Sequence, residues 1–380
     1  MNKKLQFFNK TLGLSIVSLL FIACAVHRDN YRDKDNSTFF NSNSREYTSI
    51  FSIANAGADL KGPNNQLIVA LEKEFATLSK EDDYLLFLGD NLHNSNLEDS
   101  QVSSQLDAQL SLSNSFKGTS LFLTGEQEWN ERGVIGLEDI ETYIEDFYKE
   151  EDHFLPKNGC PLEVISVNDE IELILINSQW YIEDWSKTDG INDKCELKTR
   201  VQFNTLLASE MRKARHKTLL IAMHHPLYSN GIYGGEIPST VVYKPTSENA
   251  FIPLAGASWS FLRSQGGLSK QDRYNPLMNE LMSTIELAAF DVPKVIIVSG
   301  HERSLQYIDH GAIKQVITGT GSSVKPARLS KRGLFTSTKP GYTEVRIYED
   351  NSSSVHFFTL QDGAFKEAFS QQAFEQPEPY

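Results

Sequence analysis

Residues 84–93 have the sequence YLLFLGDNLH, in which an apolar run leads directly into a short polar motif. Four other apolar runs end in the same way, and their polar motifs are Ile53-Ala54-Asn55-Ala56-Gly57, Gly125-Glu126-Gln127-Glu128-Trp129, His224-His225-Pro226-Leu227-Tyr228 and Gly300-His301-Glu302-Arg303. Ligand sites in open α/β sheets lie beyond the carboxyl ends of the strands. If these runs are strands, the five motifs are expected to converge on one site.

The apolar runs have the length and composition of buried strands. Runs rich in Ile, Val, Leu and Phe occur at residues 49–54, 84–88, 120–123, 163–167, 171–176, 218–223, 295–298, 314–317, 343–348 and 355–359. Helical spacing of apolar residues occurs at 65–80, 137–148, 201–215 and 275–289. The alternation of strands and helices in the first half predicts an α/β fold. The last two runs flank a polar segment, which predicts a C-terminal β-hairpin.

In order and surroundings, the five motifs resemble those of the calcineurin-like metallophosphoesterases, and within them the purple-acid-phosphatase branch. The resemblance covers most of the chain after residue 47 and includes the text His224-His225-Pro226-Leu227-Tyr228-Ser229-Asn230-Gly231. It implies a four-layer sandwich in which two mixed β-sheets are flanked by helices. It also implies two adjacent metal ions that generate a hydroxide nucleophile, assisted by a histidine of the third motif.

The residues that resemble ligands of the second metal ion form a full set. Asp90 matches the bridging aspartate, Glu126 takes the place of an asparagine ligand, and His224 and His301 match histidine ligands. Two carboxylates and two imidazoles suit one Zn, Mn or Fe ion. Adjacent strand residues point to opposite faces, so we expect only one of His224 and His225 to face the site. The alternative for Asp90 is an ordinary turn or helix-capping residue.

The first metal position and the catalytic position depart from the family. Asn55 replaces an aspartate ligand and Arg303 replaces a histidine ligand, and a guanidinium stays protonated and cannot ligate. His93 stands where purple acid phosphatases have a tyrosine ligand, although a surface or packing histidine is the commoner role. Gln127 replaces the catalytic histidine and cannot transfer a proton near pH 7. We therefore expect one metal ion or none, with Arg303 in the space of the lost ion and the catalytic residue unknown.

The N-terminal segment resembles a bacterial lipoprotein signal. Three lysines precede the apolar residues 12–23, which end in Phe21-Ile22-Ala23-Cys24. This pattern predicts removal of residues 1–23 and attachment to the membrane by a lipid on Cys24. The alternative is an ordinary cleaved signal with an incidental cysteine. Ala25 and Val26 give no strong inner-membrane retention signal, so the expected location is the outer membrane.

The mature chain is expected to contain one domain. Residues 24–47 are predicted to be a flexible polar tether, residues 48–362 the phosphoesterase-like domain, and residues 363–380 a polar tail. The net charge of −14 argues against a nucleic-acid partner. Cys160 and Cys195 are the remaining cysteines, and in an exported protein they are expected to form a disulfide, with two free buried thiols as the alternative.

Three functions fit these observations. The first is a catalytically impaired phosphoesterase that acts as an interaction subunit of an envelope assembly, by analogy with related domains fused to outer-membrane assembly proteins. The second is an active phosphoesterase with a single metal ion, which hydrolyses phosphomonoesters or phosphodiesters in the envelope. The third is a protein that binds phosphate or another anion through Arg303. The residues at positions 55, 127 and 303 favour the first and third, whereas the predicted single-metal set favours the second.

Overall fold

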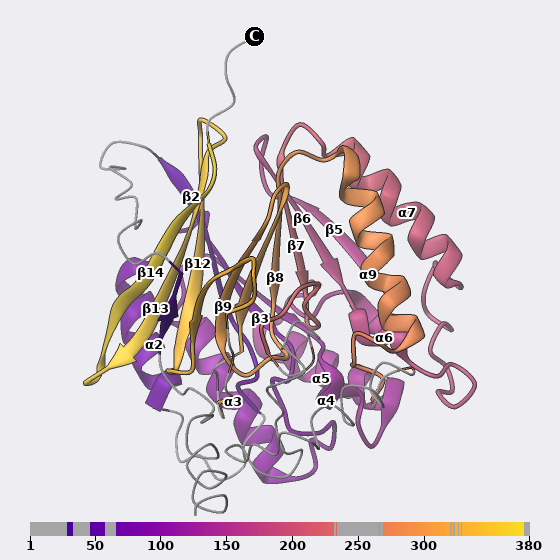
Figure 1. Ribbon diagram of the computed structural model, residues 1–380. Helices are drawn as coiled ribbons and strands as arrows, with labels where there is room; N and C mark the ends of the chain where they lie inside the picture. Colours follow the sequence, from indigo (N-terminus) through magenta and orange to yellow (C-terminus); the bar gives the residue numbers. More distant parts are fainter. Residues whose placement is uncertain are drawn as a thin grey trace, which may run out of the picture.

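Two β-sheets packed face to face form the centre of the molecule, with helices on both outer sides (Figure 1). The computed structural model describes residues 29–32, 46–57, 66–231, 233, 266, 269–319, 321, 324–325, 327 and 329–375. The larger sheet has the strand order β1-β11-β9-β10-β8-β7-β6-β5, and the smaller sheet has the order β14-β13-β12-β2-β3-β4. The expected α/β sandwich with two mixed sheets is confirmed.

The larger sheet combines a parallel centre with antiparallel edges. Strands β6, β7, β8 and β10 run parallel to one another, whereas β5 pairs antiparallel with β6, and β9, β11 and β1 continue antiparallel beyond β10. The strands are β1 (Asn30–Tyr31), β5 (Leu162–Ser166), β6 (Ile171–Ile176), β7 (Thr218–Met223), β8 (Val295–Ser299), β9 (Leu305–His310), β10 (Ile313–Thr318) and β11 (Gly333–Ser337).

The smaller sheet joins a parallel trio to an antiparallel meander. Strands β2, β3 and β4 are parallel, and β12, β13 and β14 follow one another antiparallel beyond β2. The strands are β2 (Tyr47–Ile53), β3 (Tyr84–Leu88), β4 (Thr119–Leu123), β12 (Gly341–Tyr348), β13 (Ser353–Gln361) and β14 (Ala364–Phe374). The predicted hairpin is the β12–β13 pair, which β14 extends to three strands.

The central strands are apolar throughout because both of their faces are buried. In β3, Leu85 and Phe87 pack in the core that includes the helices, whereas Leu86 and Leu88 pack in the core between the two sheets. Side chains alternate between the two faces of a strand, so each central strand contributes to both cores. An unbroken apolar run is therefore what this architecture requires.

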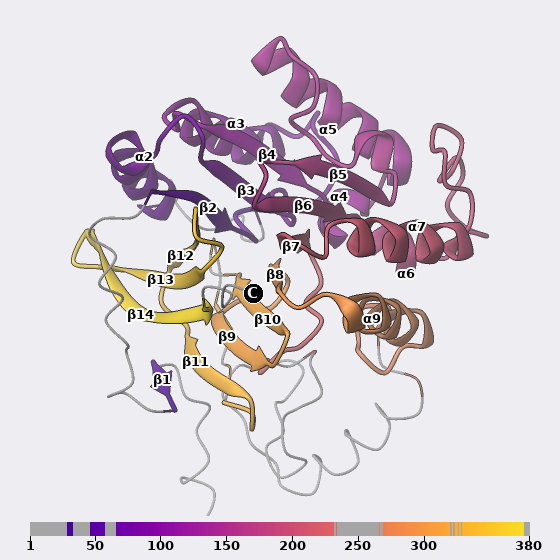
Figure 2. The same ribbon diagram turned by 90° about the horizontal axis from the view of Figure 1, so that it is seen from above.

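The helices cover the two outer faces of the sandwich. Figure 2 shows α2 and α3 beside the smaller sheet and α7 and α9 beside the larger one. Helices α4 and α5 follow β4, and α6 follows β6. The helices are α2 (Gln66–Leu78), α3 (Ser100–Asn114), α4 (Glu126–Trp129), α5 (Gly133–Tyr148), α6 (Ser178–Ile182), α7 (Arg200–Lys213) and α9 (Pro276–Ala288), with short 3₁₀ turns η2 (Lys157–Gly159) and η3 (Ala289–Asp291).

Two predicted boundaries are wrong. Residues 364–374 are not a free tail, because they form β14, which pairs along the whole of β13. Within the predicted tether, Asn30 and Tyr31 form β1, which pairs with β11 at the edge of the larger sheet. The signal segment 1–23 and Cys24 lie outside the described residues. No helix in the described part of the chain is long and apolar enough to cross a membrane.

Candidate functional site

The polar motifs meet where strands β2, β3, β4, β7 and β8 end. Asn55 Nδ2 donates a hydrogen bond to Asp90 Oδ2 at 3.0 Å, and the backbone N–H of Gln127 donates to Asp90 Oδ1 at 3.1 Å. His224 Nε2 lies 3.4 Å from Asp90 Oδ1, and the ring centroids of His224 and His301 are 5.2 Å apart. These contacts bring residues from all five motifs into one buried group around Asp90.

Three residues of this group have a backbone conformation that disfavours side chains. Asn55, Asp90 and His301 have φ values of 58°, 52° and 62°, in the left-handed region. Each such residue costs roughly 1–2 kcal/mol, and strain of this kind is typical of functional sites. Gly125 is required for a different reason, because a Cβ there would lie 2.5 Å from Asp90 Oδ1 and 2.8 Å from the His224 ring.

Asp90 is buried and its carboxylate is held by hydrogen bonds. Burial raises its pKa above the usual value, and the opposing causes are the N–H of Gln127, the charge of Arg303 and the amide of Asn55. Glu126 interacts electrostatically with the same residues. Burial raises the pKa of Glu126, the charge of Asp90 raises it further, and His224 lowers it. The predicted ligand Glu126 therefore lies in the electrostatic surroundings of Asp90 and His224. Its Oε1 also accepts a hydrogen bond from Gln127 Nε2 at 3.2 Å.

Arg303 and His93 occupy different surroundings. The positive charge of Arg303 lowers the pKa of Asp90 and disfavours protonation of His301, which places Arg303 beside the site. The hydrogen bonds of His93 are with Gln105 of α3 and with Asn94. These contacts are those of a packing histidine, and they do not connect His93 to Asp90.

Glu128 is a structural residue of the site that motif matching alone did not single out. Its side chain is fully buried, and its two oxygens accept four backbone N–H groups, from Asp90, Asn91, Leu92 and Gly125, at 2.6–3.1 Å. This carboxylate therefore fixes the turn after β3 against the turn after β4. Both Asp90 and Glu126 owe their positions to that connection.

Three histidines form a compact buried cluster. His224, His225 and His301 are 0–4 % exposed, and one ligand nitrogen from each lies within 4.8 Å of the other two. Burial lowers the pKa of all three, so they are neutral and retain a lone pair. The expectation that only one of His224 and His225 faces the site is wrong. Strand β7 ends at Met223, so the alternation of side chains does not extend to these residues.

The cluster has the donor chemistry of a metal site. Among the described residues, no hydrogen-bond partner is found for Nε2 of His224, Nε2 of His225 or either ring nitrogen of His301. A buried polar atom without a partner costs about 1–3 kcal/mol, so three such nitrogens, one from each ring, favour a shared ligand. Neutral imidazole is a preferred ligand of Zn, Cu, Fe and Ni ions. The histidines could therefore hold one metal ion.

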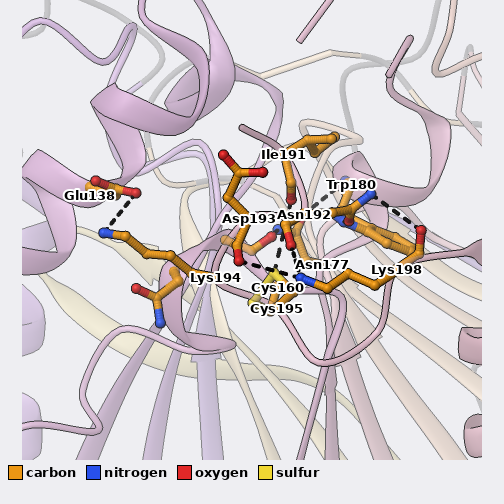
Figure 3. Close-up of a disulfide and its surroundings, with 12 residues drawn as sticks. Glu138, Cys160, Asn177, Trp180, Ile191, Asn192, Asp193, Lys194, Cys195 and Lys198 are labelled. Carbon is orange, nitrogen blue, oxygen red and sulfur yellow. Dashed lines mark hydrogen bonds and ion pairs between the residues drawn. A yellow bond between two sulfur atoms is a disulfide. The ribbon is translucent and has the colours of Figure 1, made fainter. Parts of the chain in front are cut away.

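The predicted disulfide is present, and it lies outside the five motifs. Cys160 follows η2 and is bonded to Cys195, which precedes α7, at a sequence separation of 35. Figure 3 shows the bond beneath Asn192 and near Lys194, which forms an ion pair with Glu138 of α5. In the chain-entropy description, a cross-link across such a loop stabilises the fold by about 3–4 kcal/mol.

The comparisons with known proteins bear on the fold. No protein-family model and no curated protein sequence matches the chain. Among solved structures, GAP50, "the anchor in the inner membrane complex of Plasmodium", aligns over 87 % of this chain and 90 % of its own, with a TM-score of 0.57 and 13 % identity. The purple acid phosphatase PPD1 of yellow lupin aligns over 86 % of this chain and 54 % of its own, with a TM-score of 0.52 and 11 % identity.

The fold is a metallophosphoesterase sandwich. At 11–13 % identity the likeness extends to the fold and not to the activity. The site that occupies the corresponding strand ends has to be interpreted from its own residues, which combine a metal-competent histidine cluster with Gln127 and Arg303.

Proposed function

We propose that this protein is a metallophosphoesterase-fold subunit that does not hydrolyse esters and instead contributes an interaction surface to an assembly at the cell envelope. The observation that carries this proposal is the environment of Gln127. Its amide nitrogen donates to Glu126, and its amide oxygen accepts from Asn130. An amide held between these two partners cannot protonate a leaving group.

The neighbouring charges support the same conclusion. Arg303 places a fixed positive charge close to Asp90, where it would repel a second cation. Asn55 offers Asp90 a hydrogen bond through Nδ2 and contributes no negative charge. Loss of proton transfer alone lowers an enzymatic rate by roughly 10²–10⁴-fold. A two-metal mechanism is therefore not expected here.

An attachment role agrees with what is recorded for a protein of this fold. GAP50, which aligns with this chain over most of both lengths, is described as an anchor in a membrane complex. We further propose that a lipid on Cys24 attaches this chain to the outer membrane, where its partner is an envelope protein. The folded domain would then serve as a platform on which the partner assembles.

Hydrolysis of p-nitrophenyl phosphate and bis(p-nitrophenyl) phosphate tests the enzymatic half of the proposal. With Zn, Mn or Fe present, we expect the protein to give no rate above that of the metal in buffer. The triple variant Asn55→Asp, Gln127→His, Arg303→His should hydrolyse these substrates at least 10²-fold faster than the metal in buffer does. The matched control adds Asp90→Ala to the triple variant and should abolish the gain.

A second function is favoured by the histidine cluster. One metal ion there would supply a bound hydroxide, so an active single-metal phosphoesterase is the alternative. Turnover by the unchanged protein that is lost on His301→Ala would establish this alternative and contradict the proposal. Binding of phosphate without turnover, lost on Arg303→Gln, would instead establish an anion-binding protein.

Native electrophoresis of detergent-solubilised membranes tests the assembly half. The chain should migrate in a complex much larger than its own 42.9 kDa. Because the proposed role does not depend on hydrolysis, an Asp90→Asn variant should assemble to the same extent. Migration as a free monomer in the producing cell would contradict the proposed interaction.

A further inference from the structure

We propose that the outward face of helix α7 is the surface on which this protein binds its partner, and that the partner contributes an acidic segment with an apolar side chain. This inference rests on the proposed function and deepens it, because it names the interaction surface and the chemistry of its occupant. The surface is an open hollow of about 710 Å³, which we call the α7 hollow. Its lining residues are Thr205, Ala208, Ser209, Arg212, Lys213, Arg215 and His216.

The α7 hollow lies on the side of the helix that faces away from the core. The buried side of α7 consists of Phe203, Leu207 and Met211. The opposite side carries, at intervals of three or four residues, Val201, Thr205, Ala208 and Arg212. Val201 is 72 % exposed, and the short side chains of Ala208 and Ser209 leave space between the larger residues at the two ends of this face. The backbone of another chain can therefore approach α7 closely.

The C-terminal end of this face carries positive charge that has no counter-ion. Lys213 Nζ forms an ion pair with Glu210, the only acidic residue of α7, at 2.7 Å. Arg212 and Arg215 are exposed, and neither forms an ion pair within the described part of the chain. The helix dipole favours cations in the last turn, but its effect does not extend to Arg215, which follows the helix. In a chain with a net charge of −14, two such guanidinium groups favour carboxylates as their partners.

Exposed apolar side chains lie beside the same end of α7. The turn η3 contacts α7, and its Phe290 is 86 % exposed. Leu287, one turn earlier in α9, is 77 % exposed, and these two are the most exposed large apolar side chains among the described residues. Helix α7 leads into β7 and η3 leads into β8, which is the neighbouring strand, so both ends lie at the same edge of the sheet. An occupant with an apolar side chain near its carboxylates would bury this surface as well.

The shape of the hollow suits a protein segment. A small-molecule site encloses most of its ligand, whereas this hollow is open and lies along a single helix. A groove of this kind suits an amphipathic segment, which places its apolar side chains against the groove.

The position of α7 favours a protein over a lipid surface as the occupant. Figure 2 shows β1 and α7 on opposite sides of the molecule. With the proposed lipid on Cys24, the side that carries β1 would lie next to the membrane. The face of α7 would then be directed away from the bilayer, where an envelope protein can reach it.

Charge reversal tests the surface in the full-length chain, by native electrophoresis of detergent-solubilised membranes. The variant Arg212→Glu, Arg215→Glu should lower the fraction of the chain in the large complex at least tenfold, because like charges would then face each other. Arg212→Lys, Arg215→Lys keeps both charges and should retain at least half of the complex. The matched control is Lys73→Glu, Lys117→Glu, which makes the same change in charge at two exposed residues near the smaller sheet. It should assemble as the unchanged protein does, within about twofold.

The outcomes separate this inference from the proposed function. Migration of the unchanged protein as a monomer would overturn both. A complex that persists in the Arg212→Glu, Arg215→Glu variant would overturn the α7 surface and leave the proposed function standing. Equal loss in the matched control would show a general effect of charge and would also overturn the surface. Should the charge-reversed variant fail to fold, Ser209→Trp fills the hollow without a change in charge and should lower the complex at least tenfold.

Photo-cross-linking in the producing cell identifies the occupant. p-Benzoylphenylalanine in place of Phe290 keeps an aromatic side chain at this position and should cross-link to a segment of another protein that is rich in Asp and Glu. The same replacement at Phe147, an exposed phenylalanine of α5, is the matched control and should not give this product. Cross-linking of position 290 to lipid, to a second copy of this chain or to a segment without net negative charge would overturn the proposed occupant.

Discussion

At the scale of single residues, Glu128 is the side chain on which the site geometry most depends. Its carboxylate accepts four backbone N–H groups from the two turns that carry Asp90 and Glu126. In Glu128→Gln, one of these oxygens becomes an NH₂ group that faces N–H donors, so at least one buried donor loses its partner. We expect a loss of about 2–4 kcal/mol in the free energy of unfolding, measured by urea denaturation.

Glu150→Gln is the matched control, because Glu150 is exposed directly after the turn that ends α5. It should change the free energy of unfolding by less than about 0.5 kcal/mol. If Glu128→Gln were as stable as the control, the four hydrogen bonds would not be what joins the two turns.

Residue types were predictable from the sequence, but ring directions were not. The motifs correctly indicated that Asn55, Asp90 and His224 come together, because each follows a strand whose apolar run is unmistakable. The position of His225 in the histidine cluster was missed because the alternation rule was applied to His224 and His225, which lie beyond the end of β7. Ser178 gave no signal, since its contact with His225 joins residues 47 apart in the sequence.

At the scale of elements, Glu141 of α5 connects the helix to the turn that precedes the disulfide. Its carboxylate accepts the backbone N–H of Asn158 in η2 at 2.7 Å, and burial raises its pKa from the usual 4.5 to about 7. The folded protein therefore holds this proton in a pH range where the unfolded chain has lost it. The resulting stabilisation is full below pH 4.5 and is lost as the pH rises through 7.

The corresponding prediction concerns the slope of stability against pH. Between pH 5 and 7, the free energy of unfolding of the unchanged protein should fall relative to that of Glu141→Gln, which has no proton to lose. Urea denaturation at pH 5, 6 and 7 measures the difference. Glu81→Gln, at an exposed position, should keep the slope of the unchanged protein. Parallel curves for Glu141→Gln and the unchanged protein would contradict the raised pKa.

Two of the elements that the sequence did not predict, α3 and β14, are polar. Helix α3 begins at the N-cap Asp99 and buries only a narrow stripe that includes Val102, Leu106 and Leu110, which is diluted by Ser and Gln at the other positions. Strand β14 lies at the edge of its sheet and is mostly half-exposed, so its apolar residues alternate with Lys, Glu, Ser and Gln. Burial on both faces made the central strands predictable, and burial on one face made these elements resemble loops.

At the scale of the whole molecule, β1 determines how far the fold can lie from its predicted lipid anchor. Asp29 accepts the hydroxyl of Ser337 at 2.6 Å and forms an ion pair with Lys339 at 2.7 Å. Asn30 and Tyr31 pair with β11. Only five residues then separate Cys24 from the edge of the larger sheet, and five residues span at most about 17 Å. The tether predicted over residues 24–47 could have extended several times further.

With a lipid on Cys24, the β1–β11 edge is therefore expected to lie close to the membrane. A fluorophore at Lys331→Cys, beside β11, should transfer energy to labelled vesicle lipids more efficiently than one at His216→Cys, after α7. Five strand spacings separate β1 from β7, about 24 Å in all, so the two positions differ in distance from the proposed anchor. Cys160 and Cys195 are bonded to each other, so the introduced thiol is the one that reacts.

A twelve-residue Gly/Ser insertion after residue 28 should reduce the transfer from position 331, because it adds roughly 20 Å of flexible chain. Equal transfer from both positions, unchanged by the insertion, would show that β1 does not hold the fold at the membrane.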